Sequence, residues 1–172
     1  ILSSIAYEKE QNRDTVGWLI VPGTDINNSV VQGFDNSYYL RRTERKEDDI
    51  YGCYFADYNN AFGTREELSP NTVIYGHSDL TDSPDGPKFS QLFRFTDQQF
   101  AKEHPVISFS TQEDLMDWQI VAVYYTDLNL DFTNTEYDPA ALAQEAAARS
   151  IWNYGVPVTS QDKLLSLVTC TV

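Results

Sequence analysis

The chain alternates short apolar runs with polar, turn-forming residues over most of its length. The runs are rich in β-branched and aromatic residues, and Gly, Pro, Asn and Asp separate them. This pattern is typical of an antiparallel β protein, and connections of very different length favour a barrel over a regular sandwich. We therefore predict a mainly β fold, a closed barrel of seven to eight short strands. The strands are expected at residues 18–21, 29–33, 51–57, 72–75, 106–110, 118–125 and 164–172.

Two helices are expected in the first part of the chain. Residues 1–14 are mostly good helix formers and end at a turn-like stretch, which predicts an N-terminal helix. Thr96 and Gln99 have the spacing of a capping box, in which each side chain bonds a backbone N–H at the start of a helix. A short helix should begin there and end before Pro105, because the residue before a proline avoids helical dihedral angles.

A third, longer helix is expected over residues 138–152. Asp138 and Pro139 are the residue types preferred at the N-cap and at the first helical position. The stretch that follows is almost all Ala, Leu, Gln and Glu, and Gly155 ends it. This helix lies between two predicted strands. Because no linker, repeat or low-complexity tract divides the chain, we predict a single domain over residues 1–172.

The net charge narrows the classes of partner. The chain has 12 Lys and Arg against 26 Asp and Glu, a formal net charge of −14, which repels phosphate backbones and anionic lipid surfaces. We therefore expect no nucleic-acid partner. Apolar residues make up 41% of the chain, more than a disordered acidic chain carries. No run of about 18 apolar residues occurs, and we expect a soluble domain cut from a longer protein.

Candidate catalytic residues are few, because the chain has two His and two Cys. His77 ends the β-run over residues 71–77, and Cys170 lies in the β-run over residues 164–171. Neighbouring strands of a barrel would bring the thiol within reach of the imidazole. The thiolate of such a pair attacks a carbonyl carbon, and the imidazole protonates the leaving amine. The pattern therefore indicates acyl-transfer chemistry.

The same residues also have structural interpretations. A cysteine on a strand is usually a small core residue, which is what we expect of Cys53, and a long-range disulfide between the two cysteines stays open. A histidine at a strand end is often a hydrogen-bonded turn residue. The histidines and cysteines lack the local spacing of a zinc site, and Asp79, Asp82 and Asp85 lack that of a calcium loop. We expect no metal and no cofactor.

The order of the two β-runs resembles that of a known family. Asn-Thr-Val-Ile-Tyr-Gly-His at residues 71–77 and Leu-Val-Thr-Cys-Thr at residues 167–171 are similar to the two motif strands of sortases, the cysteine transpeptidases of Gram-positive cell surfaces. Residues 16–24, 30–40 and 54–58 resemble the class B branch. So do the N-terminal helix and the helix over 138–152, which in class B lies between the sixth and seventh strands. The resemblance covers nearly the whole chain.

The resemblance implies a mechanism and a set of site residues. Cys170 is then the nucleophile and His77 the catalytic histidine. The cysteine attacks the Thr carbonyl of an NPQTN-like or LPXTG-like sorting signal, and an amine of a peptidoglycan precursor or of a pilin resolves the thioacyl-enzyme. By position, the residues expected to bind the signal are Asn36, Leu40, Tyr75, Phe132, Val168 and Thr171.

One feature of the family has no counterpart in this sequence. Sortases carry a catalytic arginine on the last strand, shortly after the cysteine, whereas the sequence given ends at Val172. We expect that the last strand is missing from this chain. A chain that truly lacks this arginine should be nearly inactive, because an oxyanion donor is worth about 2.7 to 4 kcal/mol in other enzymes. The arginines that are present, none of which matches that position, are Arg13, Arg41, Arg42, Arg45, Arg65, Arg94 and Arg149.

The resemblance also implies a location and partners. It implies the outer face of the bacterial cytoplasmic membrane, an N-terminal anchor in the full-length protein, and surface proteins with a sorting signal as substrates. A different class of function stays open, an acidic β-barrel that binds partners at the cell surface and in which Cys170 is an inert packing residue. Papain-like proteases fit less well, because they place the cysteine before the histidine.

Overall fold

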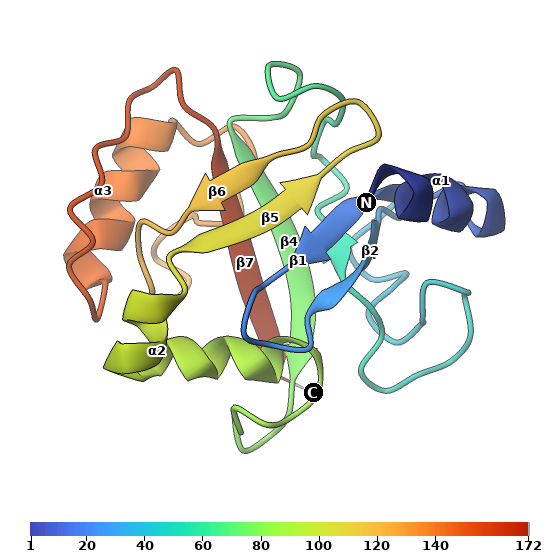
Figure 1. The fold of residues 1–172 in the computed structure, drawn as a ribbon, viewed down its shortest axis with the longest axis horizontal. Coiled ribbons are helices and arrows are strands. Elements are labelled where there is room, and N and C mark those ends of the chain that lie inside the picture. Colours follow the sequence, from blue (N-terminus) through green and yellow to red (C-terminus); the bar gives the residue numbers. More distant parts are fainter. Residues whose placement is uncertain (172) are drawn as a thin grey trace.

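The computed structural model describes residues 1–171, with side chains for residues 1–169 (Figure 1). Seven strands and three α-helices are present in this part of the chain, together with one 3-10 helix. The strands are β1 (Thr15–Ile20), β2 (Asn27–Val31), β3 (Phe55–Ala56), β4 (Asn71–Ser78), β5 (Val106–Ser110), β6 (Asp117–Gln119) and β7 (Leu164–Thr171). The helices are α1 (Leu2–Gln11), α2 (Gln98–Glu103) and α3 (Pro139–Arg149), and the 3-10 helix η1 spans Lys88–Thr96.

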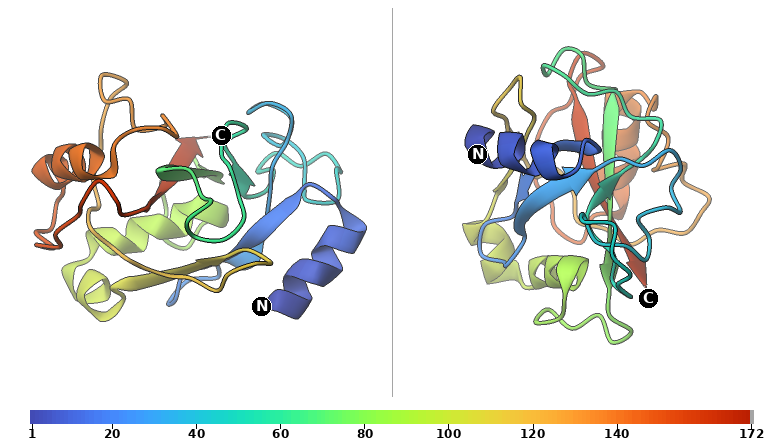
Figure 2. Two further views of the ribbon diagram at one scale, coloured as in Figure 1. Left: turned by 90° about the horizontal axis from the view of Figure 1, so that it is seen from above. Right: turned by 90° about the vertical axis from the view of Figure 1, so that its right-hand side faces the viewer.

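All described strands belong to one sheet with the order β6-β5-β1-β2-β3-β4-β7. The sheet curls into a nearly closed barrel (Figures 1 and 2). Residues of both edge strands, β6 and β7, line one cavity. The mainly β barrel predicted from the sequence is therefore confirmed, with α1 before it and α3 between the sixth and seventh strands.

The antiparallel expectation is wrong for two of the strand pairs. β2 pairs with β3 in parallel, and β4 pairs with β7 in parallel over eight residues. A parallel pair needs a long crossover connection, and the chain between β4 and β7 supplies one that includes α3. The β4–β7 pair is thus made by segments far apart in sequence, which an apolar pattern cannot match to one another.

Two strands are shorter than their sequence pattern predicts. β3 keeps only two residues of the expected 51–57 strand, and β6 ends at Gln119 instead of continuing to residue 125. Beyond β6, the backbone forms hydrogen bonds with residues outside the strands. The N–H of Ile120 donates to the Pro105 carbonyl, and the N–H of Val123 donates to Ser150 Oγ. The apolar run predicts burial, but the run forms a strand only where its backbone hydrogen-bonds with a neighbouring strand.

The helices lie where they were predicted, with different ends. α1 covers residues 2–11 of the expected 1–14, and α3 covers 139–149 of the expected 138–152. The N-cap of α2 is Asp97, whose Oδ1 accepts from the N–H of Phe100 at 2.8 Å, so the predicted capping box at Thr96 is wrong by one residue. The Thr96 hydroxyl instead donates to the Phe93 carbonyl in η1, which the sequence pattern does not predict.

The main core fills the inside of the barrel and holds one face of β4. Phe89 from η1, Phe109 from β5 and Ile74 from β4 are fully buried in it. Gly76, the residue before His77, lies against the ring of Phe89, where a Cβ would come within 2.6 Å of a ring carbon. Because only glycine fits there, β4 packs closely on η1 and presents alternate residues, Tyr75 and His77, on its other face.

Candidate active site

The two candidate catalytic residues occupy facing positions on neighbouring strands. β4 and β7 run in parallel from Asn71 opposite Leu164 to Ser78 opposite Thr171, and this register pairs His77 with Cys170. Residues that face each other in a sheet lie on the same side of it. The side chains of Cys170 and Thr171 lie outside the described residues, as does Val172. The backbone register alone therefore brings the predicted histidine and cysteine together.

His77 is held by a main-chain group. Its side chain is buried, with 2% of the residue exposed, and Nε2 lies 2.7 Å from the carbonyl oxygen of Leu40. A carbonyl oxygen only accepts hydrogen bonds, so Nε2 carries a proton and donates. Leu40, predicted from the family pattern to bind the signal, thus touches the histidine through its backbone.

A positive charge approaches the same nitrogen. Arg41 Nη1 lies 3.4 Å from His77 Nε2 and donates to the carbonyl of Ile50 at 2.6 Å. The guanidinium comes from the connection between β2 and β3, not from a strand after the cysteine. The sequence does not predict this contact, because no local pattern pairs residue 41 with residue 77.

Two further predicted residues meet beside the histidine. The Tyr75 hydroxyl donates to Asp57 Oδ2 at 2.7 Å, and Asn36 Nδ2 donates to the same oxygen at 3.0 Å. The Tyr75 ring stacks on Phe55, with 5.2 Å between centroids. Asp57 was not among the residues predicted from the sequence to belong to the site. The only available signal was its place inside the 54–58 segment that resembles class B sortases.

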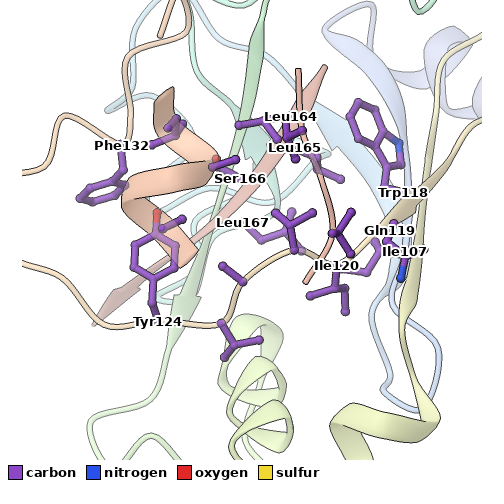
Figure 3. Close-up of a pocket in the computed structure, with 18 of the residues that line it drawn as sticks. Ile107, Trp118, Gln119, Ile120, Tyr124, Phe132, Leu164, Leu165, Ser166 and Leu167 are labelled. Atoms are coloured by element: carbon purple, nitrogen blue, oxygen red, sulfur yellow. The ribbon is translucent and has the colours of Figure 1, made fainter. Parts of the chain in front are cut away.

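Phe132 lies apart from this cluster. It lines an apolar cavity of about 750 Å³ between β7, α3 and the segment after β6 (Figure 3). Its carbonyl oxygen accepts from Asn71 Nδ2 at 3.0 Å, at the start of β4. Val168 links the two regions, because it is paired with Tyr75 in the β4–β7 ladder and also lines the cavity. Among residues 1–169, the lining of this cavity does not include the predicted residues around the histidine, which are Asn36, Leu40, Tyr75 and His77 itself.

The second cysteine belongs to the core. Cys53 is buried beside Tyr39 and Phe55, and burial raises the pKa of its thiol well above its ordinary value. A buried thiol with a raised pKa is a poor nucleophile. This agrees with the prediction that Cys53 is an ordinary core residue.

The acidic loop after β4 bonds its own backbone. Asp79 Oδ1 accepts from the N–H of Ser83 at 2.9 Å, in a turn that ends at Gly86. Within the described part of the chain, no three His, Cys, Asp or Glu side chains gather closely enough to hold a metal ion.

The barrel and the register of β4 and β7 together indicate a class of protein. A nearly closed mixed β-barrel that pairs a histidine with a cysteine on adjacent parallel strands has the architecture of the sortases, as the two β-runs predicted.

Comparisons with known proteins narrow this class. No family model matches the chain. The chain is 33% identical to sortase B of Listeria monocytogenes and 29% identical to sortase B of Staphylococcus aureus, in each case over 92% of its own length. It spans 63% and 64% of the length of these two relatives.

Solved structures agree with the sequence relatives. A substrate complex of S. aureus sortase B matches 96% of this chain and 76% of that chain, with a TM-score of 0.85 and 28% identity. Sortase B of Clostridium perfringens matches 96% of this chain and 90% of that chain, with a TM-score of 0.81 and 26% identity. The chain is thus similar over most of its length to sortase B proteins of several bacteria, in sequence and in fold.

Proposed function

We propose that the protein is a cysteine transpeptidase that cleaves a sorting signal after its threonine and transfers the new carboxyl end to an amine. The observation that carries this proposal is the register that sets His77 opposite Cys170 on β4 and β7. Similarity to sortase B supports it, as does the buried setting of the histidine.

In the first step, the Cys170 sulfur forms a bond to the threonine carbonyl carbon, and the carbonyl oxygen takes up negative charge. When the carbonyl re-forms, the C–N bond to the next residue breaks, and the leaving amine takes a proton from the His77 imidazolium. In the second step, an acceptor amine attacks the thioester and gives a proton to His77, and the cysteine leaves as thiolate. Each proton is thus returned at the end of the cycle.

The substrates are proposed from the family and from structures of relatives. We propose an NPQTN-like or LPXTG-like signal on a surface protein and a cell-wall or pilin amine as acceptor. One solved structure similar to this chain is described as sortase B complexed with triglycine, and another as a sortase B-substrate complex. Asn36, Leu40, Tyr75, Phe132, Val168 and Thr171 are the residues that we propose contact the signal.

We propose that this reaction takes place at the outer face of the bacterial cytoplasmic membrane, where surface proteins emerge. The full-length protein would be held there by an anchor preceding the sequence. No helix within residues 1–171 has the length and apolar character to cross a membrane.

The intact mass of the protein after incubation with NPQTN and LPXTG model peptides tests the proposal. We expect an added mass equal to the part of the signal that ends at threonine, formed with one of the two peptides. Cys170→Ala should abolish the adduct, and Cys53→Ala should leave it in place, because Cys53 is buried in the core. Because a chain without the last-strand arginine should be nearly inactive, the assay uses the full-length protein that carries this strand. The absence of any adduct with either peptide would then contradict transpeptidation of these signals.

Alkylation separates this function from an acidic binding barrel with an inert Cys170. For a transpeptidase we expect iodoacetamide to modify Cys170 before Cys53. The rate at Cys170 should fall at least about tenfold in His77→Ala, because the thiolate is the reactive form and a neighbouring imidazolium raises its fraction. Equal or negligible labelling of both cysteines would favour the binding barrel.

A further inference from the structure

Asp57 is a buried carboxylate at the edge of the candidate site. It follows β3, and 4% of the residue is exposed. Its Oδ2 accepts from the Tyr75 hydroxyl at 2.7 Å and from Asn36 Nδ2 at 3.0 Å, and its Oδ1 accepts from the N–H of Asn59 at 2.9 Å. A buried carboxylate is costly unless hydrogen bonds replace its lost hydration. Two of the three donors that stabilise Asp57 are side chains assigned to signal binding.

The same segment holds the Asn36 amide at both ends. Nδ2 donates to Asp57, and Oδ1 accepts from the N–H of Tyr58 at 3.0 Å. An amide side chain can otherwise exchange its donor and acceptor ends by rotation. Asp57 and the backbone of the next residue therefore decide which end of Asn36 points where.

The carboxylate also decides whether the Tyr75 oxygen donates or accepts its other hydrogen bonds. A phenol hydroxyl can donate one hydrogen bond, and the Tyr75 hydroxyl donates it to Asp57 Oδ2. Any other hydrogen bond that this oxygen makes is one in which it accepts. Tyr75 lies two residues before His77 on the same face of β4, opposite Val168 on β7. The Tyr75 oxygen therefore offers only an acceptor to other groups next to His77 and Cys170.

We propose that Asp57 is the positioning residue of the signal-binding wall: its carboxylate holds the Tyr75 hydroxyl and the Asn36 amide in the orientation that binds the signal. The inference rests on the proposed transpeptidase function and deepens it. Asp57 touches no substrate and acts through the two side chains that it orients.

Asn60 provides a matched control. It is also buried, and its side chain forms two hydrogen bonds, both to the backbone: Nδ2 donates to the carbonyl of Asn71, and Oδ1 accepts from the N–H of Val73. Loss of this side chain should lower stability without turning Asn36 or Tyr75.

The experiment measures two quantities in Asp57→Ala, Asp57→Asn and Asn60→Ala, well below the melting temperature of each variant. The first is hydrogen exchange of the Asn36 side-chain amide by NMR, which needs no ligand. The second is the affinity for the NPQTN and LPXTG peptides, in a Cys170→Ala background that cannot cleave them. A cycle that combines Asp57→Ala with Asn36→Ala tests whether the two residues act together.

If Asp57 positions the wall, Asp57→Ala speeds exchange of the Asn36 amide and weakens peptide binding at least about tenfold, a change of about 1.4 kcal/mol. Asp57→Asn keeps binding within about threefold, because its amide oxygen still accepts from Asn36 and Tyr75. Its NH2 cannot accept from the N–H of Asn59, and this loss lowers stability without turning the two side chains. Asn60→Ala leaves both measurements at the wild-type level. In the cycle, Asp57→Ala costs less once Asn36 is already alanine, and what remains is its effect through Tyr75.

Unchanged exchange and unchanged affinity in Asp57→Ala would overturn the inference, as would full additivity in the cycle. If the Cys170→Ala parent binds neither peptide, the proposed signal fails, and the exchange measurement still decides the inference. Rapid exchange in Asp57→Ala but not in Asn60→Ala would then support it, and slow exchange in both would overturn it.

Discussion

At the scale of single residues, the position of His77 depends on a main-chain carbonyl and on a glycine behind it. The Leu40 carbonyl accepts from His77 Nε2, and Gly52 lies directly against that carbonyl. Gly52 has a φ of +59°, and a Cβ there would lie 2.7 Å from the Leu40 oxygen and 2.5 Å from the Tyr39 oxygen. A side chain at residue 52 would therefore displace the group that orients the histidine.

Gly52→Ala should destabilise the protein and disturb the site, and Gly155→Ala is its matched control. Gly155 has a similar φ of +62° but nothing within 4 Å of a built Cβ. We expect a loss of about 1 kcal/mol in the free energy of unfolding for Gly155→Ala, from the left-handed backbone alone, and on the order of 3 kcal/mol for Gly52→Ala, where backbone atoms must also move.

Urea unfolding measures both losses, and the rate of Cys170 alkylation reports on the histidine. We expect this rate to fall only in Gly52→Ala. Equal losses of stability in the two variants, with equal alkylation rates, would show that Gly52 does not support the Leu40 carbonyl.

At the scale of elements, α2 and α3 both begin at an aspartate that satisfies backbone N–H groups. Asp138 Oδ2 accepts from the N–H of Ala141 at 3.0 Å, and Pro139 follows as the first helical residue. α3 buries Leu142, Ala143 and Ala146, which line the cavity beside β7. The start of this helix thus supports one wall of the cavity beside β7, the strand that carries Cys170.

Asp138→Ala should cost about 1 kcal/mol in the free energy of unfolding, the usual loss for an N-cap. Asp138→Ser keeps an oxygen that accepts the same N–H, so its loss should be about a few tenths of a kcal/mol at most. Thermal or urea unfolding measures the difference between the two variants. If serine and alanine are equally destabilising, the hydrogen bond to Ala141 contributes nothing measurable.

At the scale of the whole molecule, buried titratable groups tie stability to pH. Burial raises the pKa of Tyr39 and Cys53, which lie in one core cluster, and that of Tyr54 in the main core. The folded protein keeps these protons to a higher pH than the unfolded chain does. Because the unfolded chain then binds fewer protons, the free energy of unfolding falls as the pH rises.

We expect this fall to begin near pH 9, the ordinary pKa of a cysteine being 9.0, and to steepen near pH 10, where tyrosine ordinarily titrates. Each group contributes up to about 1.4 kcal/mol per pH unit above its ordinary pKa. Urea unfolding between pH 7 and 10.5 measures the slope. Cys53→Ala should lower stability at every pH but flatten the slope between pH 9 and 10, and an unchanged slope would contradict this account.

Local sequence pattern was enough to predict the class of fold and the positions of the three α-helices, but not that of η1. Short β-branched runs predicted the barrel, and Asp138-Pro139 predicted α3, because strand and helix preferences act over a few neighbouring residues. Pattern failed where backbone partners come from far away. The apolar run at 118–125 is a strand only as far as Gln119, since its later residues bond loops rather than a neighbouring strand.

For the site, the sequence by itself determined the chemistry available: a histidine at the end of one β-run, a cysteine in a later one, and a glycine before the histidine. Only the tertiary structure decided which groups meet. The register of β4 and β7 pairs His77 with Cys170, the Leu40 carbonyl orients the histidine, and Asp57 joins Asn36 to Tyr75. These contacts join residues 18 to 93 positions apart, and local preferences do not extend over such distances.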